Sequence, residues 1–252
     1  MMIFSLAGLE LRRMFLSPLA WIVLAVVQFI VAYLFLTRVD LFLQVQGRLA
    51  SLDGAPGLTD IIVAPVLGNS AVVLLLVTPL LTMRLVSEER RSRTLSLLFS
   101  APISMSEIIL GKYLGVLTFF GVMLLLITAM ALSLLAGGTL DFGMLATGLL
   151  GLGLLMASFA ALGLFISTLT EQPTVAAVGT FGVLLLLWVL DWAGQGSMGE
   201  TGAVFAYLSL LRHFQTLLQG VVDSRDLIYY VLFIATFLAL GIRRLDAERV
   251  QG

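Results

Sequence analysis

The chain contains no cysteine and only one histidine, His213. The absence of cysteine excludes a disulfide framework, a thiol nucleophile and a thiolate metal site. A single imidazole argues against a histidine metal cluster, so we expect no metal or cofactor in this chain. The net charge of -1 gives no overall attraction to nucleic acid, and we expect no nucleic-acid partner.

Charge of either sign is also scarce. Charged residues make up 12% of the chain, hydrophobic residues make up 60%, and the mean hydropathy is +1.10. A soluble globular domain carries roughly 25% charged and about 45–50% apolar residues. The composition therefore indicates an integral membrane protein. The chain also lacks the G-x-x-x-x-G-K-[ST] loop that holds ATP phosphates, so we expect no ATPase site of its own.

Long apolar stretches are what the chain does have. A helix needs about 20 mostly apolar residues to cross a hydrocarbon core of about 30 Å. We predict an all-α, polytopic membrane protein, one domain over residues 1–252, with six spans. The first span is 18 residues long and exceeds the usual apolar region of a signal peptide, although a removed signal peptide is the alternative. The spans are placed at residues 19–36, 61–83, 113–136, 142–168, 174–190 (the helix continuing through 191–192) and 227–242.

The distribution of Lys and Arg predicts the orientation. With the N-terminus inside, ten of the fourteen basic residues lie on the cytoplasmic side, which agrees with the positive-inside rule. Both termini and the segment 84–112 are therefore predicted to face the cytoplasm. The segments 37–60 and 193–226 become long outer loops. The four outer basic residues are Arg38, Arg48, Arg212 and Arg225.

The charge that is present is concentrated in residues 84–115. The pattern predicts an interfacial amphipathic helix over residues 84–100, which Pro102 then stops. Ser104 and Glu107 form a capping-box pattern that starts a new helix leading into the third span. The eight charged residues of the segment are Arg84, Glu88, Glu89, Arg90, Arg91, Arg93, Glu107 and Lys112.

Two interpretations of this segment remain open. The basic residues can anchor the loop against anionic lipid headgroups. Alternatively, the segment is a docking lever, because acidic residues beside arginines suit a protein partner better than a purely basic strip. A rigid helix joined to two spans would pass a partner's movement into the membrane, and that partner would have to supply the energy.

The residues SEERRSRTLSLLFSAPIS, followed by GKYLG, resemble the cytoplasmic signature of permease subunits of type 2 ABC transporters. That signature is close to E-x-x-x-G-T-L-E-L-L-L-S-x-P-I-S, then G-K. A second stretch, YLSLLRHFQTLLQGVVDSRDLIYY, resembles the gliding-motility-type (GldF-like) branch, with its L-S-x-x-x-H-F and G-V-[IV]-D-x-R-D-x-x-Y elements. The positions that match the first signature are Glu88 or Glu89, Thr94, Leu95, Leu97, Leu98, Ser100, Pro102, Ile103, Ser104, Gly111 and Lys112.

The sequence departs from the family pattern at two positions. Arg93 stands where the family usually has glycine, which argues for an uninterrupted helix rather than a tight turn. Ser96 stands where the family often has glutamate, which removes one expected polar contact with the ATPase.

The resemblance implies a permease subunit of an ATP-driven exporter in the bacterial inner membrane. ATP and Mg would be bound by a separate cytoplasmic ABC ATPase subunit. A second permease copy, most simply in a homodimer, and an auxiliary periplasmic subunit are the other partners implied, besides the lipid bilayer. Residues 5–17 would form an interfacial N-terminal helix, which a generic membrane anchor explains equally well. The ATPase-coupling residues implied are Glu88, Glu89, Arg90, Arg91, Arg93, Thr94 and Glu171, although Glu171 is equally well read as a solvated turn residue.

The outer segment before the last span is too polar for a span and too apolar for a free loop. We predict helices that lie in or dip into the outer leaflet, and a functional interpretation makes them a lid over the exit path. His213 has no obvious partner in the sequence and is read first as a packing or hydrogen-bonding residue. Asp223 to Asp226 are expected to cap the last span. The lid residues are His213, Phe214, Asp223, Arg225 and Asp226.

Other classes of membrane protein fit less well. A secondary transporter would need an ionisable site near the centre of a span or an internal repeat, and the sequence shows neither. An intramembrane enzyme would need paired catalytic residues at depth, and the only histidine lies in the outer segment. A non-transporting membrane scaffold stays open as an alternative.

Overall fold

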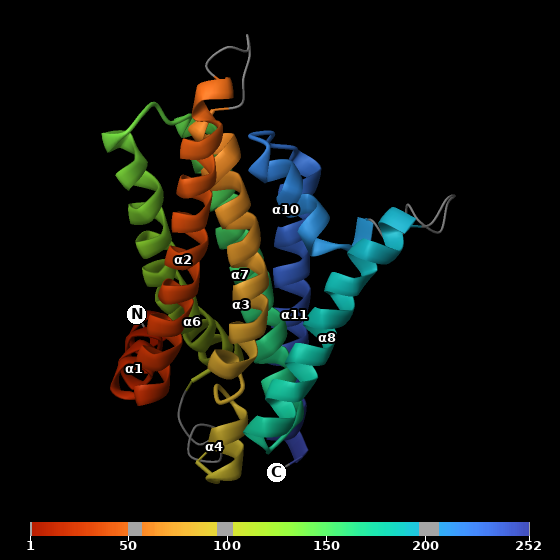
Figure 1. Ribbon diagram of the computed structural model, residues 1–252. Coiled ribbons are helices and arrows are strands. Elements are labelled where there is room, and N and C mark those ends of the chain that lie inside the picture. The colour runs from red at the N-terminus through yellow and green to blue at the C-terminus, as the bar shows by residue number, and fades with distance from the viewer. Residues whose placement is uncertain (1, 50–56, 95–102, 197–206, 252) are drawn as a thin grey trace.

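The computed structural model describes residues 2–49, 57–94, 103–196 and 207–251 (Figure 1). Within these residues the chain is helical and contains no strand. The elements are α1 (Met2–Leu16), α2 (Pro18–Leu49), η1 (Thr59–Val63), α3 (Ala64–Thr82), α4 (Ser87–Arg91), α6 (Met105–Ser133), η2 (Leu134–Ala136), α7 (Phe142–Leu169), α8 (Pro173–Gly196), α10 (Leu210–Leu218) and α11 (Ser224–Gln251).

Six helical segments of the described chain are long and apolar enough to cross a membrane. This confirms the all-α polytopic fold. The helix of the fifth candidate span, α8, includes residues 191–192 as predicted. The six candidate spans are Pro18–Gly47, Thr59–Arg91, Met105–Ala136, Phe142–Leu169, Pro173–Leu190 and Ser224–Arg249.

Two helices are longer than their predicted spans. The helix α2 continues to Leu49, so the first part of the predicted outer loop 37–60 is helical. The helix α11 begins at Ser224 and continues to Gln251, nine residues beyond the predicted end at 242. Hydropathy marks where a helix lies in hydrocarbon, whereas the helix itself continues until a residue breaks it. Polar pairs such as Gln44 Nε2 to Asp40 Oδ2, at 2.9 Å, support the extension of α2.

The helix α7 forms the centre of the bundle (Figure 1). It packs against α3, α6, α8, α10 and α11, and it is the most buried of the candidate spans. Apolar residues such as Leu152, Leu155 and Ala161 are fully enclosed by these neighbours. Between membrane helices such packing supplies van der Waals attraction rather than a water-driven hydrophobic effect.

The two ends of the bundle carry different helices. The helices α1 and α4 and the C-terminal part of α11 lie at one end, which we call the α4 end (Figure 1). The opposite end, which we call the α10 end, carries α10 and the start of α11. This arrangement places the N-terminal helix, the charged segment and the C-terminus together, as the sequence predicts.

Two glycines of α6 allow α1 to pack closely on that helix. A Cβ atom at Gly111 would lie 2.6 Å from Leu6 Cβ, and one at Gly115 would lie 2.8 Å from Glu10 Cβ. Real Cβ atoms do not approach this closely, and the contacting atoms are stem carbons rather than flexible side-chain ends. The small residues therefore fix the position of α1, and with it the position of Glu10.

We expect Gly115→Ala to destabilise the protein by about 1–3 kcal/mol, because the added methyl group overpacks the contact with α1. Gly121→Ala is the matched control on the same helix, since a Cβ there meets nothing within 4 Å. The control should be neutral or stabilising by up to about 1 kcal/mol. Unfolding by SDS in mixed micelles measures both variants, and equal effects would contradict the packing argument.

Candidate functional site: the charged helix α4 and its partners

The helix α4 is a five-residue turn with favourable charges at both ends. Glu88 and Glu89 lie in its first turn, and Arg90 and Arg91 lie in its last turn. Negative charge near the N-terminus and positive charge near the C-terminus both complement the helix dipole. Local sequence thus favours this turn, although a helix this short also needs tertiary support.

Ser167 of α7 supplies support at the start of α4. Its Oγ atom accepts hydrogen bonds from the backbone N–H groups of Val86 and Ser87, both at 3.1 Å, and donates to the carbonyl of Met83 at 3.1 Å. Ser87 also donates its hydroxyl to the Met83 carbonyl. The hydroxyl of Ser167, which is fully buried, therefore connects α4 to the centre of the bundle.

The predicted uninterrupted helix over residues 84–100 is wrong. The helix α4 ends at Arg91, and Arg93 adopts a left-handed backbone conformation with φ of 56°. The N–H of Thr94 bonds to the carbonyl of Glu89 at 3.0 Å, and the N–H of Arg93 bonds to that of Arg90 at 3.1 Å. These bonds form a Schellman motif, in which glycine is the usual left-handed residue. Arg93 therefore has the left-handed conformation that glycine usually adopts in this motif. Residues 95–102, which include Ser96 and Pro102, lie outside the described part of the chain.

We expect Arg93→Gly to stabilise the protein by about 1 kcal/mol, because glycine adopts the left-handed conformation without the Cβ strain of arginine. Arg93→Ala removes the same charge but keeps the Cβ atom, so it should not stabilise. SDS unfolding of the two variants separates backbone strain from charge. Stabilisation by alanine as large as that by glycine would contradict this explanation.

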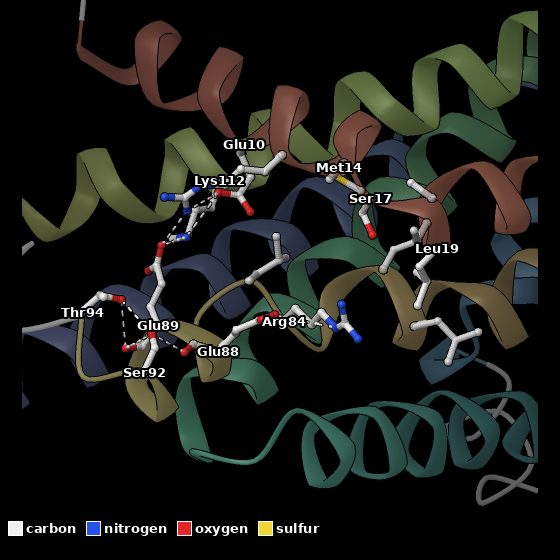
Figure 2. Close-up of a pocket in the computed structure, with 15 residues that line it drawn as sticks. Glu10, Met14, Ser17, Leu19, Arg84, Glu88, Glu89, Ser92, Thr94 and Lys112 are labelled. Carbon is white, nitrogen blue, oxygen red and sulfur yellow. Dashed lines mark hydrogen bonds and ion pairs between the residues drawn. The ribbon is translucent and has the colours of Figure 1, made fainter.

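The side chain of Glu89 points into the protein rather than toward solvent (Figure 2). Lys112 Nζ donates to Glu89 Oε1 at 2.7 Å and to Glu10 Oε2 at 3.4 Å. Arg13 Nη1 donates to the same Glu89 oxygen at 3.2 Å. Lys112 is only 5% exposed, so these carboxylates, rather than water, surround its ammonium group. The four residues, which we call the Glu89 cluster, connect α4 to α1 and α6.

The next residue, Arg90, connects α4 to a different helix. Its Nη2 atom lies 2.7 Å from both carboxylate oxygens of Glu248, near the C-terminal end of α11. The Arg90 side chain is 12% exposed and that of Glu248 is 23% exposed. Partial burial and two short contacts make this a stronger pair than an ordinary surface ion pair. Two adjacent residues of α4 are therefore fixed to opposite neighbours.

The remaining charged residues between positions 84 and 94 are exposed, and so is the uncharged Thr94. They are Arg84, Glu88, Arg91 and Arg93, and Glu88 forms an ion pair of 3.7 Å with Arg84. A groove of about 640 Å³ lies between α4 and the turn that joins α7 to α8. Its lining residues are Arg90, Arg91, Arg93, Glu171, Gln172 and Thr174. The structure therefore brings Glu171 close to the other predicted coupling residues, from which it is distant in the sequence. We call Glu88, Arg91, Arg93 and Glu171 the α4 face.

A second cavity, of about 400 Å³, lies on the other side of α4 (Figure 2). Its charged lining includes Arg84, Glu88 and the Glu89 cluster, and its apolar lining includes Leu19 and Leu80. The Glu89 cluster separates it from a smaller cavity of about 300 Å³ between α1 and α6.

The capping box predicted at the start of the third span is present. Ser104 accepts from the N–H of Glu107 at 3.2 Å, and Glu107 Oε2 accepts from the N–H of Ser104 at 3.0 Å. Each side chain satisfies a free amide of the other's backbone, which fixes where α6 begins.

The predicted lid residues gather at the α10 end around the only histidine of the chain. His213 Nδ1 lies 2.6 Å from Asp226 Oδ1, and its Nε2 lies 2.9 Å from the carbonyl oxygen of Tyr207. Asp226 is thus the partner that the sequence did not reveal. Asp223 accepts from the N–H of Arg225 at 2.9 Å at the start of α11, as predicted, whereas the Arg225 side chain is exposed.

Phe214, the residue after His213, is buried between α10 and α7. A Cβ atom at Gly151 of α7 would lie 2.9 Å from Phe214 and from Leu217. Both side chains are buried, so α10 is packed into the bundle rather than exposed as a free loop.

The arrangement of His213 does not form a catalytic pair. The ring nitrogen that would serve a nucleophile faces a backbone carbonyl, which cannot act as one. Among the described residues, no group of three or more His, Asp or Glu side chains is placed to hold a metal ion.

Sequence reasoning missed two anchors of α4, Glu248 and Ser167. Glu248 lies 158 residues from Arg90, and Ser167 lies 80 residues from Ser87. No local pattern marks either residue. Lys112 was recognisable from the sequence as part of the G-K pair. The structure explains this pair: Gly111 has no side chain and lets α1 pack closely on α6, and Lys112 forms ion pairs with Glu10 and Glu89.

A family model described as "ABC-2 family transporter protein" matches residues 5–250. A search of the curated proteins found no match. The match covers both the α4 segment and the segment around His213. The six candidate membrane spans are consistent with a membrane component of a transporter. The chain therefore belongs to the ABC-2 family of transporter proteins, as a membrane-embedded permease without an ATPase site of its own.

Proposed function

We propose that this permease is an exporter subunit of the gliding-motility-type (GldF-like) branch and that a separate cytoplasmic ATPase drives it through the α4 face. The observation that carries the proposal is that neighbouring residues of α4 make different contacts. Glu89 is bound to α1 and α6, and Arg90, which borders the groove, is bound to α11. Arg91 and Arg93 are exposed and line the same groove with Glu171. A helix that transmits a partner's movement needs an exposed surface for the partner to bind. It also needs bonds to the other helices of its own protein.

The distribution of charge supports a cytoplasmic position for the α4 end. The ten basic residues assigned to the inner side lie on α1, between residues 84 and 112, and on the last part of α11, which are all at this end. We therefore place the protein in the bacterial inner membrane with both termini in the cytoplasm.

The partners follow from this assignment. The ATPase would bind ATP and Mg, which the permease does not. Two permease copies, most simply identical, would form the path between them, and an auxiliary periplasmic subunit would contact the α10 end. Residues 207–226 would act there as an outer lid.

The test is co-purification with an ABC ATPase from the same genome. We expect Arg91→Glu to reduce the ATPase recovered with the permease at least tenfold, because the exposed cation reverses sign in the proposed groove. Arg12→Glu is the matched control, since Arg12 is exposed at the same end but lies on α1, away from the groove. Equal recovery with Arg91→Glu and the parent protein would exclude docking through this face.

The same preparation distinguishes a transporter subunit from a scaffold. ATP hydrolysis by the recovered complex in lipid should depend on the permease, and Arg91→Glu should abolish that dependence. An ATPase that binds but hydrolyses ATP at the same rate without the permease would favour the scaffold.

A further inference from the structure

We propose that α11 is a rigid link that carries movement of α4 to α10 at the opposite end of the molecule, and that Glu248 is the positioning residue at its inner end. The inference rests on the proposed docking of an ATPase at the α4 face. It assigns a role to Glu248, Asp226, Tyr229 and Tyr230, which all lie on this single helix.

The inner connection is the pair of Arg90 and Glu248. Both Glu248 oxygens lie 2.7 Å from Arg90 Nη2, so the contact fixes the position of one helix against the other. Glu248 also lies 3.4 Å from Arg244, but Arg244 is 46% exposed and belongs to the same helix, so this pair does not connect α11 to α4. Leu245, one turn before Glu248, is fully buried and keeps this part of α11 against the bundle.

The outer connection consists of three side chains of α11 that bind α10 and the residues just before it. Asp226 binds His213 at 2.6 Å. Tyr230 donates its hydroxyl to the carbonyl of Leu210 at 2.7 Å, and Tyr229 donates to that of Leu208 at 2.8 Å. The rings of Tyr229 and His213 are also stacked, with centroids 4.2 Å apart. The start of α10 is thus attached to α11 by directional bonds.

The contact between α10 and α7 is of another kind. Phe214 and Leu217 rest against Gly151 of α7, and apolar contacts of this type have no preferred direction. Hydrogen bonds weaken steeply when their angles change. A shift of α11 that keeps these hydrogen bonds intact therefore takes the start of α10 with it.

The distance suits a link across the membrane. Asp226 and Glu248 are separated by 22 residues of continuous helix, or about 33 Å at the usual rise per residue. This is close to the thickness of the hydrocarbon core of about 30 Å. A movement of α4 that an ATPase imposes at one face would thus reach the lid at the other face without an intervening loop.

The experiment measures the movement of α10 directly. Because the chain has no cysteine, Gln215→Cys on α10 and Leu135→Cys in η2 can carry spin labels without background labelling of the permease. Both positions are exposed. Pulsed EPR then gives the distance between the labels in the permease–ATPase complex, without nucleotide and with a non-hydrolysable ATP analogue and Mg.

We expect a nucleotide-dependent shift in this distance in the parent complex, its loss in Glu248→Gln, and its return in the charge swap Arg90→Glu/Glu248→Arg. Arg244→Gln is the matched control and should keep the shift. The ATPase should still co-purify with Glu248→Gln, because the α4 face is unchanged.

A normal shift in Glu248→Gln, or no shift in the parent complex, would overturn the inference. Loss of the ATPase from Glu248→Gln would also overturn it, since the pair would then serve docking alone. The proposed function fails separately, if the parent protein does not recover an ATPase or if Arg91→Glu recovers it normally.

Discussion

Lys112→Met should destabilise the protein by about 3–5 kcal/mol, more than any exposed charge substitution. Lys112 is nearly buried and lies between Glu89 and Glu10. Methionine fills similar space but leaves two mostly buried carboxylates with Arg13 as the remaining cation. Removing one partner of a buried ion pair is costly because the remaining charge loses its compensation away from water. SDS unfolding in mixed micelles measures the change.

The control for this prediction is Arg84→Met, which breaks the ion pair between Arg84 and Glu88. Both side chains of that pair are more than half exposed, and the atoms are 3.7 Å apart. Solvent screens such a pair, so the expected loss is below about 1 kcal/mol. Similar losses for Lys112→Met and Arg84→Met would show that the Glu89 cluster does not hold α4.

The second large effect is expected at the α10 end. His213→Leu should destabilise the protein by about 3–5 kcal/mol, because it leaves the buried Asp226 carboxylate without its partner. Replacing both residues, in His213→Leu/Asp226→Leu, removes the unpaired group as well. We expect the double variant to recover at least half of the loss, since an apolar pair of similar volume needs no compensation.

The two single variants and the double variant form a cycle that isolates the interaction between the side chains. Arg225→Leu is the matched control, because Arg225 is exposed one residue before Asp226. Additive losses for His213→Leu and Asp226→Leu would contradict the direct pair. They would also remove one of the three outer connections on which the α11 link depends.

Local sequence sufficed wherever a structural feature depends on residues close together in the chain. The capping box of Ser104 and Glu107 spans four residues, and its geometry is present as expected. The six spans were located because a hydrocarbon core selects for apolar residues over a fixed length. Their ends were less well predicted, because α2 and α11 continue as helices into polar sequence.

The turn after α4 shows where local inference failed. Arginine at position 93 argued for a continuous helix, since a residue with a Cβ atom disfavours the left-handed conformation. The structure has that conformation nonetheless, with φ of 56°. The Schellman hydrogen bonds of Arg93 and Thr94, together with the anchoring of α4 from both sides, offset the strain.

The sequence by itself determined the class of protein, its six spans, and the presence of a charged segment between the second and third of them. Only the tertiary structure decided which of those charges bind other helices and which are exposed at the surface. Successive residues of a helix point about 100° apart, so Glu89, Arg90 and Arg91 face three different surroundings. Those surroundings are built by α1 and α6, by α11 and by open solvent, and no local pattern in residues 84–94 records which of them lies on which side.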